Sequence, residues 1–384
     1  MKQKIYFDYA ATTPIDSRVV KAMEPFFNKK FGNASSLHSF GNETKKVLEK
    51  NRNIIAKAIN AKESEIIFTS SATESNNTAL KGVAFANKGK HILVSSVEHD
   101  CVLNSAKWLK AKGYDVELLS VDKYGMVNPK EVERKIRKDT ILVSVMHVNN
   151  EVGTIEPISE IGSICRKNNV YFHTDASQSF GKIPIDVVDM NIDLLTASSQ
   201  KIYGPKGAAI LFIRNGVKIE PLLHGGGQEM NMRSSTENIP AIVGFGKATE
   251  LCLAEMKKEN KRLTKLRDRI IKTILKKIDN SYLNGHPKER ISNNVNIRFS
   301  FIEGESILFM LDSFGVGIST ASACSSPKLE PSHVLSAMGL KHEEAHGSIR
   351  ISIGRMTKDK DVDYLLNVLP KAIEKIRLIS PHKK

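Results

Sequence analysis

Cysteine and long apolar runs are scarce in this sequence, and each scarcity excludes a class of protein. The 384 residues hold four cysteines, which form neither a CxxC pair nor the spacing of a metal finger. No apolar run approaches the roughly 18 residues that a membrane span needs. The first eight residues lack the apolar core of a signal peptide. We therefore expect a cytoplasmic protein with reduced thiols and no membrane partner.

Glycine motifs that bind nucleotide phosphates are also missing. Neither a Walker lysine motif nor a GxGxxG fingerprint occurs, so a nucleotide is not the favoured ligand. The net charge of +15 is compatible with nucleic acid as a partner. Much of that charge, however, lies between Lys257 and Lys277, where leucine and isoleucine interleave with basic residues at helical spacing and aromatic residues are absent. This pattern is typical of an amphipathic helix with a solvated basic face, and it disfavours nucleic acid.

What the sequence does contain is a regular alternation of strand-like and helix-like segments. Short apolar runs predict strands, and helical patterns lie between many of them. Strands that alternate with helices favour a mainly parallel, doubly wound α/β sheet. The expected strands cover residues 66–69, 91–95, 116–120, 141–146, 170–174, 193–197 and 208–213, with helices at 101–112, 129–137 and 158–167 among those between them.

The pattern changes after Pro221. A polar, glycine-rich loop precedes a helix from about residue 240 to 255, and the basic helix follows as a separate element. The C-terminal part predicts a shorter α+β arrangement, whose last helix we expect to kink or break at Pro370. Its expected strands are 292–299 and 346–353, and its helices 306–314, 331–338 and 360–378. We therefore predict a large domain over residues 15–255 and a small one over residues 1–14 and 256–384.

Lys201 lies at a corner between an apolar run and a Gly-Pro-containing loop. Open α/β sheets bind ligands at the carboxyl ends of their strands. A lysine there can form a Schiff base, because burial and neighbouring cations free its amine. For this stretch alone, a solvated surface lysine is the more common case.

Other polar groups at strand ends make a functional role for Lys201 more convincing. Asp175 ends an apolar run, and a carboxylate there can hold a proton on a pyridine nitrogen. His99 follows another run and offers a flat ring for stacking. Residues 70–80 read as a small-residue turn and a helix start, which can bind an anion through free N–H groups, although a simple helix cap is more common. Together these groups match the needs of pyridoxal phosphate.

Five stretches of the sequence resemble one enzyme family. They are residues 7–13, 71–77, 147–153, 201–207 and 322–326. All look like motifs of the cysteine desulfurases, which belong to the class V aminotransferase-like pyridoxal phosphate enzymes. The Ser-Ala-Cys-Ser-Ser form around Cys324 resembles the group that feeds iron–sulfur cluster assembly.

The resemblance implies a fold and a set of roles. The fold would be that of a fold type I pyridoxal phosphate-dependent transferase, with a mainly parallel seven-stranded sheet and a smaller α+β domain. The catalytic residues would be Lys201, Cys324 and His99. The cofactor would be bound by Ala72, Thr73, His99, Asn150, Asp175, Gln178, Ser198, Gln200, Lys201 and Thr236, and the substrate L-cysteine by Asn33, Asn150 and Arg350. Thr236 would reach the phosphate bound to the partner subunit, which implies a homodimer.

The implied reaction takes sulfur from L-cysteine, releases L-alanine and leaves a persulfide on Cys324. An iron–sulfur scaffold protein would accept the sulfur, and Cys324 would contact a cluster only during transfer, with no resident metal. A selenocysteine lyase or another class V aminotransferase is the alternative among enzymes, and a cofactor-binding scaffold without activity is another.

Three positions depart from the family pattern, and the cysteines differ in their surroundings. Gln200 stands where the family usually has histidine, so we expect altered phosphate affinity; Ala34 replaces a common proline and Ser235 a common glycine. Cys324 lies in a small, polar stretch that suits a reactive thiolate. The other cysteines, at positions 101, 165 and 252, fall in helix-like segments and are expected to be structural.

Overall fold

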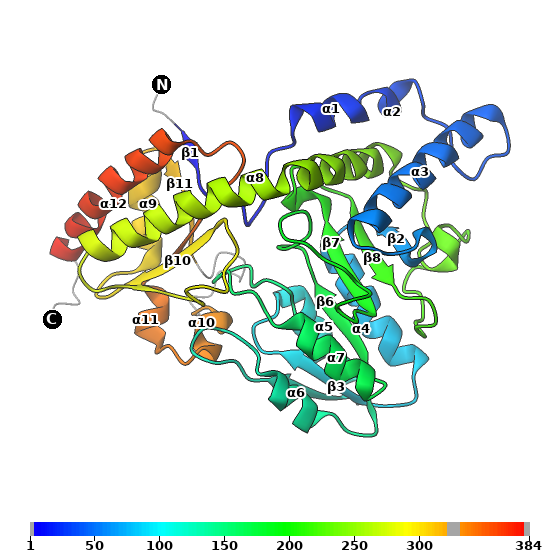
Figure 1. Ribbon diagram of the computed structural model, residues 1–384, viewed down its shortest axis with the longest axis horizontal. Helices are drawn as coiled ribbons and strands as arrows, with labels where there is room; N and C mark the ends of the chain where they lie inside the picture. The colour runs from blue at the N-terminus through cyan, green and yellow to red at the C-terminus, as the bar shows by residue number, and fades with distance from the viewer. Residues whose placement is uncertain (1–3, 321–330, 380–384) are drawn as a thin grey trace.

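The computed structural model describes residues 4–320 and 331–379 of the chain (Figure 1). A seven-stranded sheet forms the centre of the larger lobe. Four of its neighbouring pairs are parallel, whereas β8 is antiparallel to both of its neighbours. The strands, in their order across the sheet, are β2 (Ile66–Thr69), β8 (Ala209–Ile213), β7 (Leu194–Ser198), β6 (Tyr171–Asp175), β5 (Thr140–Ser144), β3 (His91–Ser95) and β4 (Asp115–Leu119). The mainly parallel α/β sheet of seven strands predicted from the sequence is confirmed.

Helices cover both faces of this sheet because its strands are apolar on both sides. All residues of β2, β3, β7 and β8 are buried, as expected of strands that pack between two layers of helices. Capping side chains define several helix starts: Ser71 caps α4, and His99 caps α5. The helices of this lobe are α1 (Ser17–Met23), α2 (Pro25–Asn28), α3 (Ser39–Ala58), α4 (Ala72–Ala86), α5 (Asp100–Ala111), α6 (Pro129–Lys135) and α7 (Ile158–Lys167).

The smaller lobe contains a four-stranded antiparallel sheet. Its strands are, in order, β12 (Ser319–Thr320), β13 (Ser348–Ser352), β10 (Asn294–Phe299) and β9 (Ser281–Leu283). A separate pair joins β1 (Ile5–Tyr6) to β11 (Val316–Gly317), so the N-terminal segment is part of this lobe. The helices here are α9 (Gly304–Ser313), α10 (His333–Ala337), α11 (His342–His346) and α12 (Asp359–Ile379).

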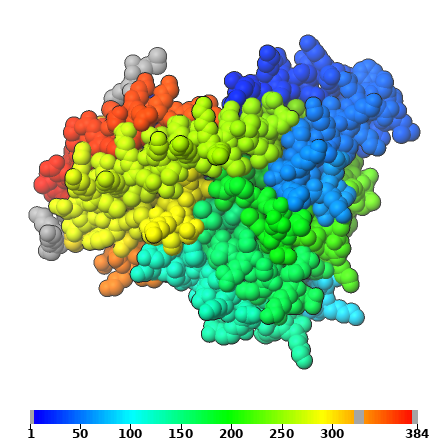
Figure 2. Space-filling view, viewed as in Figure 1, coloured from blue at the N-terminus to red at the C-terminus, as the bar shows by residue number. Residues whose placement is uncertain are grey.

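One long helix replaces the two helices that we predicted between residues 240 and 277. Helix α8 (Ile239–Lys277) runs without interruption for 39 residues, about 58 Å. The predicted break near residue 256 does not occur, because Ala254, Glu255, Met256 and Lys257 all favour helix and no glycine or proline lies among them. Figures 1 and 2 show α8 crossing from one lobe to the other.

The predicted break at Pro370 does not occur, whereas a kink there stays a prediction. Helix α12 continues through this proline to Ile379. The missing backbone hydrogen bond is offset by apolar burial on either side, since Leu369, Ala372 and Ile373 are all buried. The helix therefore stays docked on the small lobe along its length.

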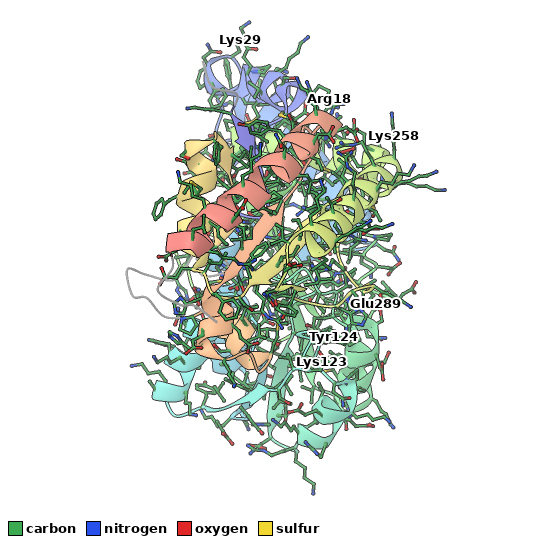
Figure 3. The ribbon with its side chains drawn as sticks, turned by 90° about the vertical axis from the view of Figure 1, so that its left-hand side faces the viewer. Arg18, Lys29, Lys123, Tyr124, Lys258 and Glu289 are labelled. Carbon is green, nitrogen blue, oxygen red and sulfur yellow. The ribbon has the colours of Figure 1, made fainter. Side chains whose placement is uncertain are left out.

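The outer face of α8 carries the concentrated positive charge. Lys257, Lys258 and Lys265 are exposed, and Figure 3 shows Lys258 extending away from the ribbon. Arg267 differs: it is buried and donates to the carbonyls of Arg290 and Ile291 at 2.9 and 3.0 Å. No helix in the described ranges has both the length and the apolar character to cross a bilayer.

Two separate apolar cores meet along α8. The N-terminal half of the helix, up to Cys252, packs into the core beside the large sheet. From Leu263 onward it packs into the core of the small lobe, which also contains Ile5 and Phe7. The change from one core to the other falls between residues 252 and 263, near the predicted domain boundary at 255.

A buried ion pair fixes α3 to the loop before α8. Arg52 donates to both carboxylate oxygens of Glu229 at 2.8 Å, and Phe68 N–H donates to the same carboxylate at 2.7 Å. Both side chains are almost fully buried. Removing one partner of such a pair leaves the other charge buried and uncompensated.

We therefore expect Arg52→Met to lower the free energy of unfolding by about 3–5 kcal/mol. Chemical denaturation monitored by circular dichroism measures this loss. Arg137→Met is the matched control, because Arg137 pairs with Asp115 and Asp139 at an exposed site where ion pairs contribute little. Equal losses in the two variants would show that burial of the Arg52 pair is not what stabilises this contact.

Candidate active site

The site lies where β6 and β7 end side by side. Asp175 is the last residue of β6 and pairs in register with Thr196 of β7. Ser198 ends β7, and the short 3-10 helix η2 (Ser199–Lys201) places Lys201 directly beyond it. Parallel strands end at one edge of the sheet, so the carboxylate and the lysine come from adjacent strand ends, as the sequence predicted.

The N-terminal segment crosses this edge and holds Lys201. Lys201 Nζ donates to the carbonyls of Ala10 and Ala11 at 2.8 and 2.6 Å. The Ala10 carbonyl also accepts from Gln178 Nε2 at 2.9 Å. Thr13 donates through its backbone and side chain to the carbonyl of Gln200 at 3.1 and 2.9 Å. Residues 10–13 therefore form one wall of the site.

Asp175 is the buried acid of the site and is part of a polar network. Its Oδ2 accepts from Asn76 Nδ2 at 2.7 Å, and its Oδ1 accepts from Ser177 N–H at 2.9 Å. Asn76 Nδ2 also lies 3.1 Å from Cys101 Sγ, which in turn is 3.1 Å from His99 Nδ1. The network links the predicted residues Asp175 and His99 through two side chains that the sequence did not assign to the site.

Burial decides the chemistry of Cys101. It raises the pKa of the Cys101 thiol to about 12, and the negative charge of Asp175 acts in the same direction. At neutral pH the group is therefore a thiol, which contacts His99 without being a nucleophile. Cys101 is therefore a structural residue, and it contacts the site residues Asn76 and His99.

The first turn of α4 offers backbone donors near the same edge. The hydroxyl of Ser71 accepts from Glu74 N–H at 3.1 Å, while the N–H groups of Ala72 and Thr73 precede the first intrahelical hydrogen bond. Glu74 pairs with Arg233 at 2.8 Å, which offsets its negative charge. This helix start is suited to bind a phosphate.

Arg350 is buried on β13 at the boundary between the lobes. Its Nη2 donates to Asp8 Oδ1 at 2.8 Å, and its Nη1 to the carbonyl of Asn150 at 3.0 Å. Arg350 Nε and Asn150 Oδ1 are buried and have no hydrogen-bond partner within residues 4–320 and 331–379. A donor on Arg350 and an acceptor on Asn150 thus remain at the place where the sequence predicted contacts to the substrate.

Among the described residues, Asn33 and Thr236 are not joined to this cluster, whereas Thr73 hydrogen-bonds the Cys101 thiol and Gln200 contacts the wall of the site. Asn33 is exposed on the loop before α3, and its Oδ1 accepts from Ser35 N–H at 2.9 Å. Thr73 is exposed at the start of α4, and Thr236 is exposed on the loop before α8. Gln200 is beside Lys201, with its Oε1 accepting from Thr12 Oγ1 at 3.4 Å. Cys324 falls outside the described residues.

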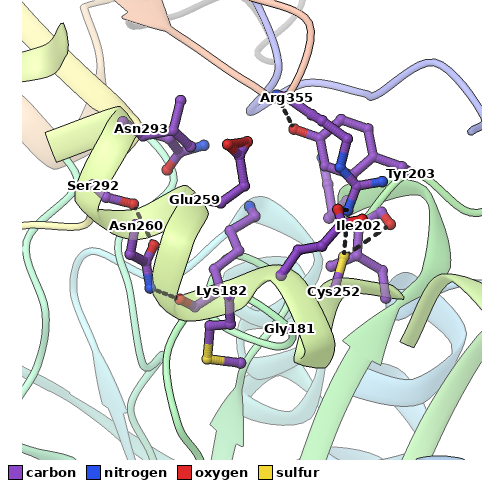
Figure 4. A pocket seen from close by; sticks show the side chains of 14 residues that line it. Gly181, Lys182, Ile202, Tyr203, Cys252, Glu259, Asn260, Ser292, Asn293 and Arg355 are labelled. Atoms are coloured by element: carbon purple, nitrogen blue, oxygen red, sulfur yellow. Dashed lines mark hydrogen bonds and ion pairs between the residues drawn. The ribbon is translucent and has the colours of Figure 1, made fainter. Parts of the chain in front are cut away.

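Lys182 is a further basic side chain that the sequence analysis missed. Its Nζ donates to Gln178 Oε1 at 3.3 Å, and with Lys201 it lines the pocket drawn in Figure 4. Burial, together with the positive charge of Lys201, lowers the pKa of Lys182 to about 7. Its position in the sequence, four residues after Gln178, gave no periodic or motif signal.

These groups fit pyridoxal phosphate on their chemistry. The site combines an amine on Lys201, a buried carboxylate on Asp175 and the helix start at Ala72 and Thr73. Such a set can bind an aldehyde, a pyridine nitrogen and a phosphate respectively. Arg350 adds a fork of donors for a carboxylate.

Comparisons with known proteins agree with this arrangement. The model of the aminotransferase class-V family matches residues 5–365. The chain is 54% identical to "Cysteine desulfurase IscS" of Dictyoglomus turgidum, over 100% of this chain and 98% of that relative. It is 55% identical to "Cysteine desulfurase IscS 1" of Archaeoglobus fulgidus, over 98% of both.

Solved structures show the same similarity. A "NIFS-LIKE PROTEIN" superposes with a TM-score of 0.91 at 37% identity, covering 97% of this chain and 100% of the other. A NifS-like protein from Rickettsia africae gives a TM-score of 0.88 at 32% identity, covering 98% and 100%. Because the family model and these relatives extend over nearly the whole sequence, this chain belongs to the class-V aminotransferase family, whose members depend on pyridoxal phosphate.

Proposed function

We propose that the protein is a pyridoxal phosphate-dependent cysteine desulfurase that supplies sulfur for iron–sulfur cluster assembly. The observation that carries the proposal is the placement of Asp175 at the end of β6 and of Lys201 just beyond the end of the adjacent strand β7. Relatives that carry the name cysteine desulfurase IscS match the chain from end to end. The alternatives of a lyase or an aminotransferase differ in what happens to the substrate sulfur, and that difference is testable.

The chain's own residues would bind the cofactor and move protons. When bound, pyridoxal phosphate withdraws electrons from the substrate Cα and so weakens its C–H bond. Lys201 would bind the cofactor and then carry a proton to and from Cα, for which a positioned base is needed. Asp175 would hold the proton of the ring nitrogen, and His99 would stack on the ring. Asn150 and Gln178 would contact the cofactor on the side of its ring oxygen. The phosphate would be bound by Ala72, Thr73, Ser198 and Gln200, and by Thr236 of the partner subunit.

Arg350 would bind the substrate carboxylate, with Asn33 and Asn150 beside it. At present Arg350 Nη2 donates to the carboxylate of Asp8, so the guanidinium is already oriented toward an anion. A substrate carboxylate would replace Asp8 as its partner. The fork of an arginine fits a carboxylate better than the point charge of a lysine does.

Arg350→Ala should raise KM for L-cysteine by about 10- to 150-fold, since a hydrogen bond to a charged group contributes roughly 1.5–3 kcal/mol. The cofactor band should remain, because Arg350 is not among the residues predicted to bind the cofactor. Steady-state kinetics measure KM, and an absorption spectrum measures the cofactor band. Arg298→Ala is the control. Arg298 lies on the neighbouring strand β10, and its Nη1 donates to Asn284 Oδ1 at 2.8 Å. An unchanged KM in Arg350→Ala would remove Arg350 from the substrate site.

Cys324 would accept the sulfur. Its thiolate would attack the sulfur of the substrate, forming an S–S bond while the Cβ–S bond breaks. The electron pair of that bond passes to Cβ, which takes up a proton, and L-alanine leaves. The described thiols support this assignment indirectly: burial raises the pKa of Cys252 to about 11 and of Cys101 to about 12, and it raises the pKa of Cys165 as well. None of these three is a thiolate at neutral pH.

Two variants separate the roles of Lys201 and Cys324. Cys324→Ala should keep the cofactor band and bind L-cysteine but release no sulfur, whereas Lys201→Ala should lose the band and all turnover. In the wild type, mass spectrometry after addition of L-cysteine should find about 32 Da added to Cys324, as expected of a persulfide. Alanine and sulfide are measured in parallel. Wild-type sulfur release by Cys324→Ala would instead favour a lyase.

The helices at the N-terminal end suggest a homodimer. Phe27, Phe31, Leu37 and Phe40 are exposed there, with 64%, 68%, 93% and 55% of their surface accessible. Figure 1 shows α1, α2 and the start of α3 projecting at one end of the molecule. An apolar patch of this kind is typical of a protein interface. We assign it to a second copy of the chain, because Thr236 would complete the phosphate site of a partner.

Replacing Phe31 and Leu37 together by aspartate should convert the dimer to a monomer, because a buried unpaired charge at an interface is costly. Analytical ultracentrifugation measures the change. Phe309→Asp is the matched control, since Phe309 is 71% exposed but lies on α9 of the small lobe. A wild-type monomer, or a variant that remains a dimer, would contradict the assignment.

Two further features are part of the same proposal. We propose a cytoplasmic location with an iron–sulfur scaffold protein as the acceptor, which the free thiols of Cys101, Cys165 and Cys252 and the names of the relatives support. We also propose that residues 15–255 form one domain and that residues 1–14 and 256–384 form the other. The two apolar cores that meet along α8 support this division.

A further inference from the structure

Lys182 brings a second lysine close to Lys201. It follows Gly181 in the loop after β6, and both lysines line the pocket between this loop and α8. Figure 4 shows the Lys182 side chain extending toward Glu259 and Asn293. Two lysines in one partly buried pocket repel each other when both carry a proton.

The acidic residues of this pocket are already paired with arginines. Glu255 forms ion pairs with Arg18 at 2.8 Å and Arg355 at 3.1 Å, and Glu259 pairs with Arg262 at 2.6 Å. No carboxylate within the described residues forms an ion pair with Lys182. The remaining titratable groups that line the pocket are Lys201, Tyr203 and Cys252. The charge of Lys182 is therefore not neutralised by a direct partner.

Lys182 also fixes the orientation of the Gln178 amide. The ammonium group of a lysine can only donate hydrogen bonds, so Gln178 must present Oε1 to it, at 3.3 Å. The amide nitrogen Nε2 then points the other way and donates to the Ala10 carbonyl at 2.9 Å. That carbonyl is the one that accepts from Lys201 at 2.8 Å. A chain of contacts thus runs from Lys182 through Gln178 and Ala10 to Lys201.

We propose that Lys182 is a positioning residue for the reaction: it fixes the Gln178 amide, and its positive charge favours the unprotonated form of the Lys201 nitrogen. The role rests on the function proposed above, in which Lys201 must lose its proton to act as a base. Burial is the main cause that lowers the pKa of Lys182 to about 7, and repulsion by Lys201 adds to it, so Lys182 carries its full charge only below neutral pH.

The test is a pH titration of the visible absorption band of the holoenzyme, which reports protonation of the Lys201 nitrogen that carries the cofactor. Lys182→Met removes the charge and keeps a similar length, so the midpoint should rise by about one pH unit. Lys182→Arg keeps the charge, so its midpoint should stay at or below that of the wild type. The acid limb of the kcat profile should shift upward in Lys182→Met by the same amount.

Lys258→Met is the control, because Lys258 is an exposed lysine on α8 whose charge is screened by solvent. Its midpoint should match the wild type, and thermal unfolding confirms that each variant is folded. An unchanged midpoint in Lys182→Met, or an equal rise in Lys182→Arg, would overturn the role of Lys182. A wild-type protein that forms no visible band or releases no alanine from L-cysteine would overturn the proposed function, and this role with it.

Discussion

The contact of Lys201 Nζ with the carbonyls of Ala10 and Ala11 is the interaction on which the site depends. It joins the edge of the large sheet to a segment that belongs to the small lobe. Phe7 N–H donates to the Gly317 carbonyl at 2.8 Å, and Ala10 N–H donates to Ser352 Oγ at 2.9 Å. The site is therefore assembled from both lobes, and its geometry depends on how α8 holds the two cores together.

Burial of charge explains much of the arrangement around this contact. A buried ion is costly unless it has partners, and the charged groups of the site differ in the partners that they have. Asp175 accepts from Asn76 and Ser177, and Arg350 pairs with Asp8. Among the described residues Lys182 donates to the neutral amide of Gln178, and burial, together with the charge of Lys201, lowers the pKa of Lys182 to about 7. At neutral pH Lys182 is therefore only partly protonated, and the charge that it keeps lies in the same pocket as Lys201.

The sequence predicted the parts of the site that follow from strand order and motif. Asp175 ends β6 and Lys201 lies just beyond the end of its neighbour β7, so alternation of strands and helices was enough to bring them to one edge. The sequence pattern predicts two helices where α8 is continuous, because the apolar pattern changes near residue 256. In the structure this change marks only the passage of the helix from one apolar core to the other. Asn76 and Cys101 could not be assigned, since their contacts join residues far apart in the sequence: Asn76 and Asp175 are separated by 99 positions. Lys182 has an ordinary sequence context, and its role arises only from the pocket.

Under the proposed function, the N-terminal segment also connects the place where the substrate would bind with the place where protons would be transferred. Asp8 supplies the carboxylate that Arg350 binds, and the carbonyls that hold Lys201 belong to Ala10 and Ala11, two and three positions further along. A short segment transmits displacement well, because its ends cannot move independently over two residues. A substrate carboxylate that took the place of Asp8 on Arg350 would therefore act on the same stretch of backbone that restrains Lys201. In this arrangement the anion that occupies Arg350 and the freedom of the Lys201 amine are coupled through the chain itself.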